Sequence, residues 1–312
     1  MKFILDLNKA WEKRVKRDEA LASYTYFKIG GPADYFVIVK TSQELKEIIL
    51  LAETAKIPWI ILGGGSNILV GDLGFRGLVI KNEAESMVVS NGTLTAESGV
   101  KMAKLAAFAN ENGLAGLEVF MSVPGTLGGA IFNNSHFRPE KGEFIGDLVE
   151  SAEILLINRG IYRNLEEFKS EIRTVDRDWF RFGYDYSRLQ DEPGVILKVK
   201  FKLKKTDPGK LKKRSMELLK ERNSRQPLGQ SSCGCMFKNP ENLSAGQLID
   251  NAGMKGKKVG RAMVSDKHAN FVINTGGAKA SEVLELMNLI KETVKNKSGV
   301  ELEPEIFMVG EF

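Results

Sequence analysis

Three consecutive glycines followed by Ser66 and Asn67 form the segment best suited to binding an anion. The segment directly follows the apolar run at residues 59–62. Because glycines lack a Cβ, the backbone amides of such a turn can approach a phosphate closely. No Lys-Ser or Lys-Thr pair follows, as in a Walker loop, and residues 68–70 read as a strand rather than as the helix that a GxGxxG turn opens. The segment is therefore either a phosphate-binding turn or a tight structural turn, and alone it favours neither.

A second glycine-rich segment, SVPGTLGGA at residues 122–130, supplies small residues, a hydroxyl and free amides in a row. Two such segments in one chain indicate a single long dinucleotide ligand rather than two isolated turns. The residues predicted to hold this ligand are Gly63, Gly64, Gly65, Ser66, Asn67, Ile68, Ser122, Val123, Pro124, Gly125, Thr126, Gly128, Gly129 and Ala130.

The cysteines and histidines do not have the spacing of a metal site or a disulfide framework. Cys233 and Cys235 are separated by one residue, which makes a bridge between them geometrically awkward, and two thiols are too few for a structural zinc site. His136 and His268 show no ligand spacing relative to them. We expect no bound metal.

Composition and charge limit the class of protein. A hydrophobic fraction of 43% and a charged fraction of 27% exclude wholesale disorder. The net charge of +5 is dispersed, so it suits an anionic ligand but does not indicate nucleic acid. Residues 1–16 lack a secretory leader pattern, and no apolar run is long enough for membrane insertion, so we expect a folded cytoplasmic protein. The oligomeric state is not indicated by the sequence.

The elements around the first glycine turn read as a small α/β unit. Residues 34–40 predict a strand, and Thr41 to Glu44 form a capping-box pattern before a helix with apolar residues at 45, 48, 49 and 52. Pro58 ends this helix region, and short strands are predicted at 59–62, 68–70 and 77–81. We place the end of this first domain at residue 84.

The later elements predict two more domains, 85–205 and 206–312. Asn91 and Gly92 suit the turn of a hairpin between 86–90 and 93–97, a helix is expected from Met102 to Gly113, and strands are expected at 151–157 and 195–203. The last domain has helices predicted at 206–226, 247–252 and 281–297, with strands at 269–274 and near 305–309.

Ordered motifs over nearly the whole chain resemble one enzyme family. FKIGGPAD (27–34), ILGGGSN (61–67), GLAGLE (113–118) and SVPGTLGGA (122–130) occur in this order. RQPLGxxSCGxxFKNP (225–240), AGQLIDxAGxKG (245–256), SxKHANFVIN (265–274) and ELEPEI (301–306) follow. Together they resemble the UDP-N-acetylenolpyruvoylglucosamine reductases of bacterial cell-wall synthesis, also called UDP-N-acetylmuramate dehydrogenases.

The resemblance implies an α+β fold in which a two-subdomain FAD-binding part of the vanillyl-alcohol-oxidase type is joined to a C-terminal α/β substrate domain. It also implies a reaction in which NADPH reduces FAD and the reduced flavin then transfers hydride to the enolpyruvyl alkene of a UDP-sugar. The adjacent carbon must then receive a proton, so the site requires a general acid and groups that polarise the substrate carboxylate. The short chain between Ser187 and Val195 resembles the subclass that lacks an extra tyrosine-bearing loop.

Two motif positions carry the implied chemistry. In the family pattern SCGSxF a serine supplies the proton, and this chain has Cys235 there. A thiol, with a pKa of about 8.5, is a more acidic donor than a hydroxyl, although a free cysteine is most often only a small buried residue. Glu305 matches the family glutamate that acts on the substrate carboxylate and intermediate, whereas outside the motif a solvated surface glutamate would be expected.

The chain departs from the family at one position. The family has a Tyr-Arg-x-Ser run whose arginine works with the glutamate, and here Asp185 stands at the arginine position. Arg188 is the predicted replacement, Arg181 is a weaker candidate, and both could instead be surface charges.

The resemblance also indicates residues that bind the substrate. Lys238, Asn239 and Gln247 are predicted to face its diphosphate or carboxylate, although Gln247 also completes a capping box with Ser244. His268 is expected to orient a neighbour rather than to transfer a proton.

Two other functions remain open. The chain could be a flavin oxidoreductase of the same cofactor fold acting on another substrate, against which the motifs around Cys235 and Glu305 argue. It could also be a catalytically impaired relative that binds a UDP-sugar, an alternative that Asp185 supports.

Overall fold

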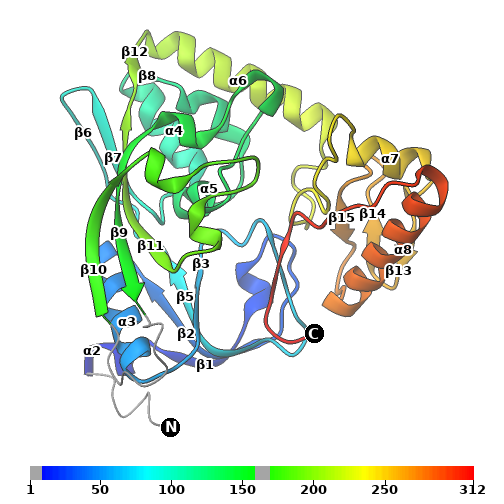
Figure 1. The fold of residues 1–312 in the computed structure, drawn as a ribbon, viewed down its shortest axis with the longest axis horizontal. Coiled ribbons are helices and arrows are strands. Elements are labelled where there is room, and N and C mark those ends of the chain that lie inside the picture. Colours follow the sequence, from blue (N-terminus) through cyan, green and yellow to red (C-terminus); the bar gives the residue numbers. More distant parts are fainter. Residues whose placement is uncertain (1–8, 159–168) are drawn as a thin grey trace. The chain divides into compact units, whose positions relative to one another are not determined.

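The computed structural model describes residues 9–158 and 169–312 (Figure 1). The chain divides into two compact units, each built from several stretches of sequence. Unit 1 contains residues 1–15, 37–63 and 79–220, and unit 2 contains residues 16–36, 64–78 and 221–312. Residues 1–8 and 159–168, which fall within the predicted first and second domains, lie outside the described residues. The division into three domains remains a prediction. The chain passes from unit 1 to unit 2 for the last time after Lys220, whereas the sequence predicted a domain boundary after residue 205.

Unit 1 is built on a five-stranded antiparallel sheet with the order β10-β9-β11-β7-β6. Its strands are β6 (Met87–Ser90), β7 (Thr93–Glu97), β9 (Val149–Asn158), β10 (Lys169–Asp176) and β11 (Gly194–Lys202). The predicted hairpin is confirmed, with Asn91 and Gly92 at φ of 51° and 77°. The predicted alternation along β11 buries Val199 and Phe201, and a bulge between Ile196 and Lys198 shifts the register so that Ile196 is buried as well.

Short helices cover the core of this unit. The helices are α2 (Lys9–Glu12), α3 (Ser42–Thr54), α4 (Met102–Glu111) and α5 (Leu127–Phe132). Around the last two lie the 3-10 turns η2 (Leu117–Ser122), η3 (Pro139–Lys141), η4 (Ile145–Leu148), η5 (Asp178–Phe180) and η6 (Arg188–Gln190). The predicted cap of α3 is confirmed, because the Thr41 side chain accepts from the amide of Glu44. The Glu44 carboxylate accepts from the amide of Lys40, one residue before the cap, so the reciprocal bond of a capping box is not made to Thr41 itself. A short pair joins β8 (Leu114–Ala115) to β12 (Lys204–Lys205).

A second sheet has the strand order β1-β2-β5-β3. Its strands are β1 (Lys16–Ala20), β2 (Pro32–Val39), β5 (Phe75–Asn82) and β3 (Trp59–Leu62), and η1 (Leu21–Tyr24) follows β1. The strands predicted at 34–40, 59–62 and 77–81 are confirmed as β2, β3 and β5. Between β3 and β4 (Ile68–Val70) runs the turn of three glycines, so the predicted strand-turn-strand arrangement is also confirmed.

Unit 2 has a core formed by α7 (Ala245–Asn251), α8 (Ala280–Ser298) and a small antiparallel sheet. That sheet has the order β13-β14-β15, with β13 (Lys258–Val259), β14 (Ala262–Val264) and β15 (Val272–Asn274). The predicted apolar face of α8 is buried, and Gly299 at φ 75° ends the helix. The last strand, β16 (Phe307–Val309), pairs in parallel with β4 of the same unit, so that Phe307 lies beside Ile68.

Asp72 ties the loop after β4 to the start of α8. Its carboxylate accepts from the amides of Ala280 and Ser281 at 2.7 and 3.0 Å and from the Ser281 hydroxyl at 2.8 Å. Burial acts to raise the pKa of Asp72, but these hydrogen bonds lower it below its ordinary value. The ionised carboxylate therefore stabilises this end of α8, where backbone amides lack helical partners.

We expect Asp72→Ala to lower the free energy of unfolding by about 1 kcal/mol at pH 7, as for a lost helix cap. The pKa of Asp72 is lowered in the folded state. The ionised carboxylate therefore makes its full contribution to the free energy of unfolding above about pH 4, and this contribution is lost as the pH falls through the folded-state pKa. Urea unfolding of the two proteins at pH 7 and pH 3 measures this, with the exposed Asp266→Ala as control. An equal difference at both pH values would contradict the assignment.

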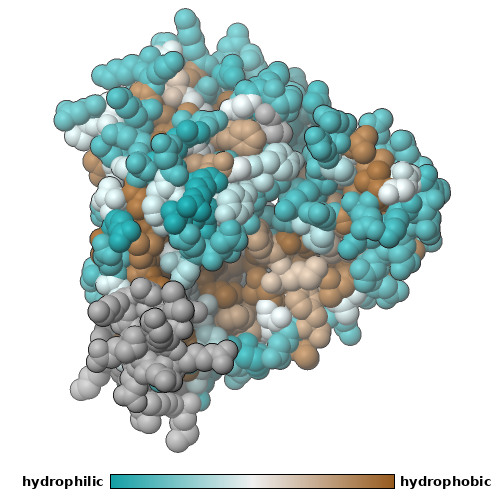
Figure 2. All heavy atoms as spheres, viewed as in Figure 1, coloured by the Kyte–Doolittle hydropathy of each residue, from teal (hydrophilic) through white to brown (hydrophobic). Residues whose placement is uncertain are grey.

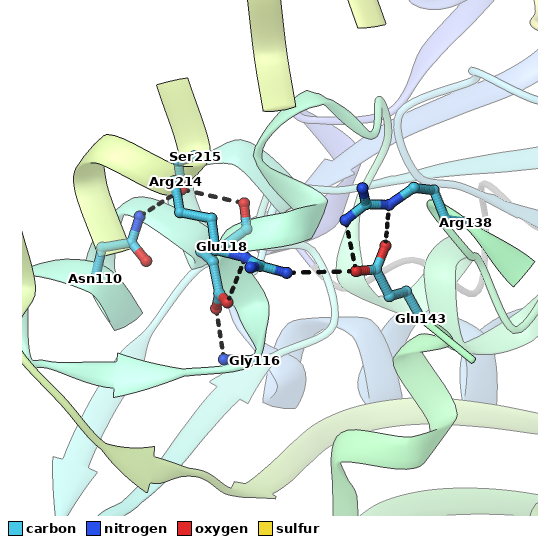
Figure 3. Close-up of polar contacts among 7 residues, drawn as sticks. All are labelled: Asn110, Gly116, Glu118, Arg138, Glu143, Arg214 and Ser215. Atoms are coloured by element: carbon cyan, nitrogen blue, oxygen red, sulfur yellow. Dashed lines mark hydrogen bonds and ion pairs between the residues drawn. The ribbon is translucent and has the colours of Figure 1, made fainter. Parts of the chain in front are cut away.

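The long helix α6 (Pro208–Arg225) begins in unit 1 and ends in unit 2. Figure 3 shows how its middle is held in unit 1: Arg214 points toward Glu118 and Glu143, at 3.4 and 3.5 Å. Glu143 is also paired with Arg138 at 2.8 Å. Beside Arg214, the buried Ser215 donates to the carbonyl of Glu118 and accepts from Asn110. These contacts keep the first part of α6 with unit 1, so the chain passes to unit 2 near the end of the helix.

The surface is mostly hydrophilic, as the dispersed charge predicted. Figure 2 shows hydrophilic residues over much of the visible face of each unit, with hydrophobic residues between them. In the described part of the chain, no helix combines the length and the apolar character needed to cross a membrane.

Candidate active site

The turn of three glycines approaches the second glycine-rich segment within unit 1. A Cβ placed on Gly63 would lie 2.3 Å from Oγ1 of Thr126, so the backbone of the turn lies directly against that side chain. The carbonyl of Gly63 accepts a hydrogen bond from Nζ of Lys81. Burial lowers the pKa of Lys81, as does the charge of Lys101, while Glu83 acts to raise it. The sequence prediction that the two glycine segments act together therefore has a geometric basis at Gly63 and Thr126.

The second segment leads into α5 and uses some of its own amides. The amide of Leu127 donates to the carbonyl of Val100, and that of Gly128 donates to the carbonyl of Ser98, at 2.8 and 2.7 Å. Gly125 has a φ of 106°, a conformation that favours glycine. Gly129 is exposed, and a Cβ there would find only Oγ1 of Thr126, at 3.9 Å. The segment therefore exposes its backbone at Gly129, while the preceding residue, Gly128, is fixed by its hydrogen bond to Ser98.

In unit 2, the rest of the turn reaches the segment that carries Glu305. The carbonyl of Asn67 accepts from the amide of Phe307 at 3.0 Å, and the Asn67 side chain donates to the carbonyl of Glu305 at 3.4 Å. The parallel pairing of β4 with β16 continues this contact. Asn67, the last residue of the first glycine-rich segment, and Glu305, the predicted catalytic carboxylate, therefore lie on neighbouring segments joined by hydrogen bonds.

Cys235 belongs to an extended segment that lies beside Glu305. The amide of Glu305 donates to the carbonyl of Met236 at 2.9 Å, and Cys235 forms an isolated bridge with Phe271. The buried side chain of Asn270 accepts from the amide of Phe237 and donates to its carbonyl, at 3.0 and 2.7 Å. The structure thus brings Cys235, Glu305 and Asn67 together on one framework of backbone hydrogen bonds, while both Cys235 and Glu305 keep part of their surface exposed.

The two cysteines have different environments, and neither forms a disulfide. Cys233 is buried in the core of unit 2 with its Sγ 3.8 Å from the sulfur of Met236. Burial raises the pKa of Cys233, a weak effect of its own backbone opposes this, and the charge of Glu305 raises it further. Gly234, at φ 92°, turns the chain between the two thiols, and a Cβ there would meet nothing within 4 Å. Cys233 therefore packs the core, and Cys235 is the thiol on the open side.

Arg222, which the sequence analysis did not single out, lies near Cys235. Burial lowers the pKa of Arg222, and the neighbouring Cys235 acts to raise it. Its Nε donates to the side chain of Gln226 at 2.6 Å, which fixes the guanidinium at the end of α6. An arginine remains protonated under these influences, so it brings a partly buried positive charge to the thiol. No sequence signal short of an alignment marks this arginine among the many basic residues of α6.

The predicted replacement for the missing arginine, Arg188, is engaged locally in unit 1. Its Nε pairs with Glu192 at 2.7 Å, and its guanidinium lies over the ring of Trp179 at 4.9 Å. Arg181 ends a 3-10 turn with a φ of 48°. Asp185 is buried and lies 3.5 Å from His136.

The predicted substrate-binding residues lie around the start of α7. The amide of Lys238 donates to the carbonyl of Glu303, and the side chain of Asn239 accepts from the amide of Ala245. Gln247 is exposed, and its amide donates to Oγ of Ser244, as the capping pattern predicted.

His268 packs against the same helix, α7. Its Nδ1 accepts from the amide of Asn270, and burial lowers its pKa, as does the charge of Lys255. A Cβ on Gly246, in α7, would lie 3.1 Å from its Cε1. His268 therefore supports the loop that presents Asn270, the residue that holds Phe237.

Among residues 9–158 and 169–312, no group of three or more histidine, cysteine or acidic side chains is arranged to hold a metal ion. The described residues of the site offer a thiol at Cys235, a carboxylate at Glu305 and a guanidinium at Arg222.

Two family models match separate parts of the chain. Residues 33–166 match the family described as FAD binding domain, and residues 226–309 match the C-terminal domain of UDP-N-acetylenolpyruvoylglucosamine reductase. The α+β fold predicted from the sequence, with an FAD-binding part and a C-terminal part, is confirmed by these matches and by the elements described above.

Relatives align with the chain over nearly its whole length. The UDP-N-acetylenolpyruvoylglucosamine reductase of Caldanaerobacter subterraneus subsp. tengcongensis is 38% identical, with 96% of this chain and 95% of the relative aligned. That of Caldicellulosiruptor bescii is 40% identical, with 95% and 91% aligned. The crystal structure of the reductase from Thermus caldophilus superposes with a TM-score of 0.76 at 33% identity, covering 95% of this chain and 99% of that chain. The chain therefore belongs to the family of UDP-N-acetylenolpyruvoylglucosamine reductases.

Proposed function

We propose that this protein reduces UDP-N-acetylenolpyruvoylglucosamine to UDP-N-acetylmuramate with NADPH as reductant and FAD as cofactor. Family membership supports the reaction, and one structural observation carries the site: Cys235 and Glu305 lie on adjacent backbone that also holds Asn67. The reaction requires both a nucleotide-sugar substrate and a redox cofactor. The two glycine-rich segments suit the binding of a dinucleotide cofactor.

The residues present fit a flavin dinucleotide. Gly63 and Thr126 lie so close that a Cβ on Gly63 would clash with the Thr126 hydroxyl, 2.3 Å away, and Gly129 is exposed. We propose that residues 63–68 and 122–130 hold the diphosphate through backbone amides and the hydroxyls of Ser66, Ser122 and Thr126. When bound, FAD would take hydride from NADPH and pass it to the substrate alkene.

Cys235 is the proposed proton donor. Once hydride has reached one alkene carbon, the carbon next to the carboxylate carries negative charge and must receive a proton. The Cys235 thiol gives its proton to that carbon and becomes a thiolate, which regains a proton from water. The partly buried guanidinium of Arg222 stabilises the thiolate by charge, so it assists the transfer.

Glu305 is proposed to act on the substrate carboxylate and on the intermediate. Its position is set by the hydrogen bonds of its own amide to Met236 and of its carbonyl to Asn67. A preorganised group of this kind contributes most where charge develops during the reaction. We further propose that Lys238, Asn239 and Gln247 contact the diphosphate or carboxylate of the UDP-sugar.

The reaction would supply a peptidoglycan precursor and thereby serve cell-wall formation, cell shape and cell division. We place it in the cytoplasm, where NADPH and nucleotide sugars are available. The partners are then small molecules rather than nucleic acid or a membrane.

Purified protein and its two half-reactions test this proposal. The protein is expected to be yellow, NADPH is expected to bleach the flavin absorbance, and the enolpyruvyl UDP-sugar is expected to restore it in a stopped-flow experiment. Flavin reduction by NADPH without reoxidation by this substrate would favour a flavin oxidoreductase with another substrate. Binding of the UDP-sugar without flavin would favour the impaired relative, which Asp185 makes the second candidate.

A further inference from the structure

A partly buried lysine lies beside the first glycine-rich segment in unit 1. Lys81 stands near the end of β5, and the three residues before it, Leu78, Val79 and Ile80, are 0% exposed. Because successive side chains of a strand point to opposite faces, this part of β5 is buried on both faces. Nζ of Lys81 donates to the carbonyl of Gly63, the first residue of the turn of three glycines. The ammonium group therefore contacts the backbone of the turn from the interior of the unit.

Further contacts join the end of β5 to the second glycine-rich segment. The side chain of Asn82 donates to Oγ of Ser98 at 2.9 Å, and the carbonyl of Ser98 accepts from the amide of Gly128 at 2.7 Å. The two segments also contact each other, since a Cβ on Gly63 would lie 2.3 Å from Oγ1 of Thr126. The end of β5 thus contacts both glycine-rich segments, and all of these residues belong to unit 1.

The charge of Lys81 is held without an ion pair. An ammonium group has three N–H donors, and the carbonyl of Gly63 accepts from one of them. No carboxylate among residues 9–158 and 169–312 forms a hydrogen bond or an ion pair with Lys81. Burial lowers the pKa of Lys81, the exposed Glu83 acts to raise it, and Lys101 lowers it further. Because burial removes part of the water around this ammonium, an anion beside it interacts more strongly than one beside an exposed lysine.

We propose that Lys81 binds the diphosphate of FAD through its charge and an N–H donor, while it also holds the carbonyl of Gly63. This inference rests on the cofactor site proposed above, in which the glycine-rich segments bind that diphosphate. The ring system of oxidised flavin is neutral, so the diphosphate is the part of the cofactor that a cation favours. Backbone amides bring dipoles to the phosphate oxygens, whereas Lys81 brings a full positive charge. Lys81 reaches the turn from β5, outside the glycine-rich segments, and so it belongs to no phosphate-binding motif.

Release of FAD from the holoenzyme measures this contribution. Lys81→Met removes the charge and the N–H donors but keeps an unbranched side chain. We expect FAD to dissociate at least about tenfold faster from this variant, as for the loss of a hydrogen bond to a charged group. Diluted holoenzyme is followed by the rise in fluorescence of free flavin. Release from the wild type should accelerate with salt concentration, because salt screens the charge, and release from Lys81→Met should accelerate much less.

Two further variants separate the charge of Lys81 from its contact with Gly63. Lys81→Gln keeps an N–H donor for the carbonyl but has no charge, and we expect it to release FAD about as fast as Lys81→Met. Lys81→Arg keeps both, and we expect it to retain most of the affinity and of the salt dependence. Wild-type release by Lys81→Gln would show that Lys81 only positions the turn, and this would overturn the proposal. Lys104→Met, which removes an exposed lysine paired with Glu85 at 3.0 Å, is the control and should release FAD like the wild type.

The reduction potential of the bound flavin distinguishes the diphosphate from the flavin ring. A cation beside the ring stabilises the reduced, anionic flavin and raises the potential, whereas a cation beside the diphosphate leaves it nearly unchanged. We therefore expect the flavin retained by Lys81→Met to have the wild-type potential. A lower potential in Lys81→Met, or release of FAD at the wild-type rate with the same salt dependence, would overturn the proposal.

The experiment separates this inference from the proposed reaction, because none of its measurements uses the UDP-sugar. A wild type that holds FAD but does not reduce the enolpyruvyl substrate would remove the reductase function and leave the role of Lys81 standing. Wild-type protein that binds no flavin would overturn both.

Discussion

Cys235→Ala is expected to lose the reduction of the enolpyruvyl substrate while NADPH still reduces the bound flavin at the wild-type rate. The thiol is the proposed proton donor to the carbon beside the carboxylate, and alanine offers no proton. Removal of a general acid typically costs about 10²- to 10⁴-fold in rate, so reoxidation of reduced flavin by the substrate should slow by at least about 10²-fold. Stopped-flow absorbance of the flavin resolves the two half-reactions in one sample.

Cys235→Ser is the matched variant for this experiment. A serine hydroxyl can also donate a proton, and the family resemblance has serine at this position, so this variant is expected to retain turnover. The charge of Arg222 should stabilise a thiolate at Cys235 more than an alkoxide in the serine variant. The reason is that the ordinary pKa of a thiol is far lower than that of a hydroxyl. Normal substrate reduction by Cys235→Ala would contradict the assignment of the proton donor. Loss of flavin from the variant would be detected as a lower flavin absorbance.

Gly63→Ala is expected to yield protein with little bound flavin. The new Cβ would lie 2.3 Å from Oγ1 of Thr126, a separation that side chains do not tolerate, and Thr126 is only 5% exposed. The turn or the threonine must therefore move, and the backbone of one glycine-rich segment shifts against the other. We expect the affinity for FAD to fall by at least about tenfold, equivalent to about 1.4 kcal/mol.

A double variant separates this clash from other effects of alanine. In Thr126→Ala the clashing oxygen is absent, and the next atom of Thr126, its Cβ, would be 3.5 Å from the added methyl group. Gly63→Ala combined with Thr126→Ala should therefore bind FAD as well as Thr126→Ala alone. Gly183→Ala, which lies outside both segments and whose Cβ would be 3.6 Å from Cβ of Tyr186, is the control for adding a methyl group to unit 1. The ratio of flavin to protein absorbance after purification, followed by titration of the apoprotein with FAD, gives the result.

Much of the fold follows from local patterns in the sequence. The Thr41 cap of α3, the Asn91-Gly92 hairpin and the apolar face of α8 each depend on residues close together in the chain, and each is confirmed. Two strands had no such signal. β1 (KRDEA) and β10 (KSEIRTVD) are polar and mostly exposed, and both lie at the edge of their sheets, so pairing rather than burial makes them strands.

Some predicted boundaries were wrong for a local reason. The strand expected at 269–274 begins only at Val272, because the amide of Phe271 donates to the carbonyl of His268 and closes a turn. That turn leaves Asn270 free of the strand ladder, and its side chain instead holds Phe237. Tertiary contacts of this kind are not encoded in the spacing of apolar residues.

The site was predictable only as far as motifs extend. Motif resemblance located Cys235, Glu305 and the two glycine-rich segments, and their individual roles stay predictions. Arg222 could not be found in this way, because its significance comes from Cys235, 13 positions away. An arginine in a basic helix carries no signal until the fold places a thiol beside it.

The parallel pairing of β4 with β16 also governs when the site can form during synthesis. At about 5 to 20 residues per second, the ribosome needs roughly 12 to 47 s to proceed from Val70 to Phe307. Throughout that interval β4 lacks the partner strand, and Asn67 lacks its contacts with Phe307 and Glu305. A nascent chain that ended before residue 300 would therefore lose the carboxylate and would leave Asn67 without that backbone support.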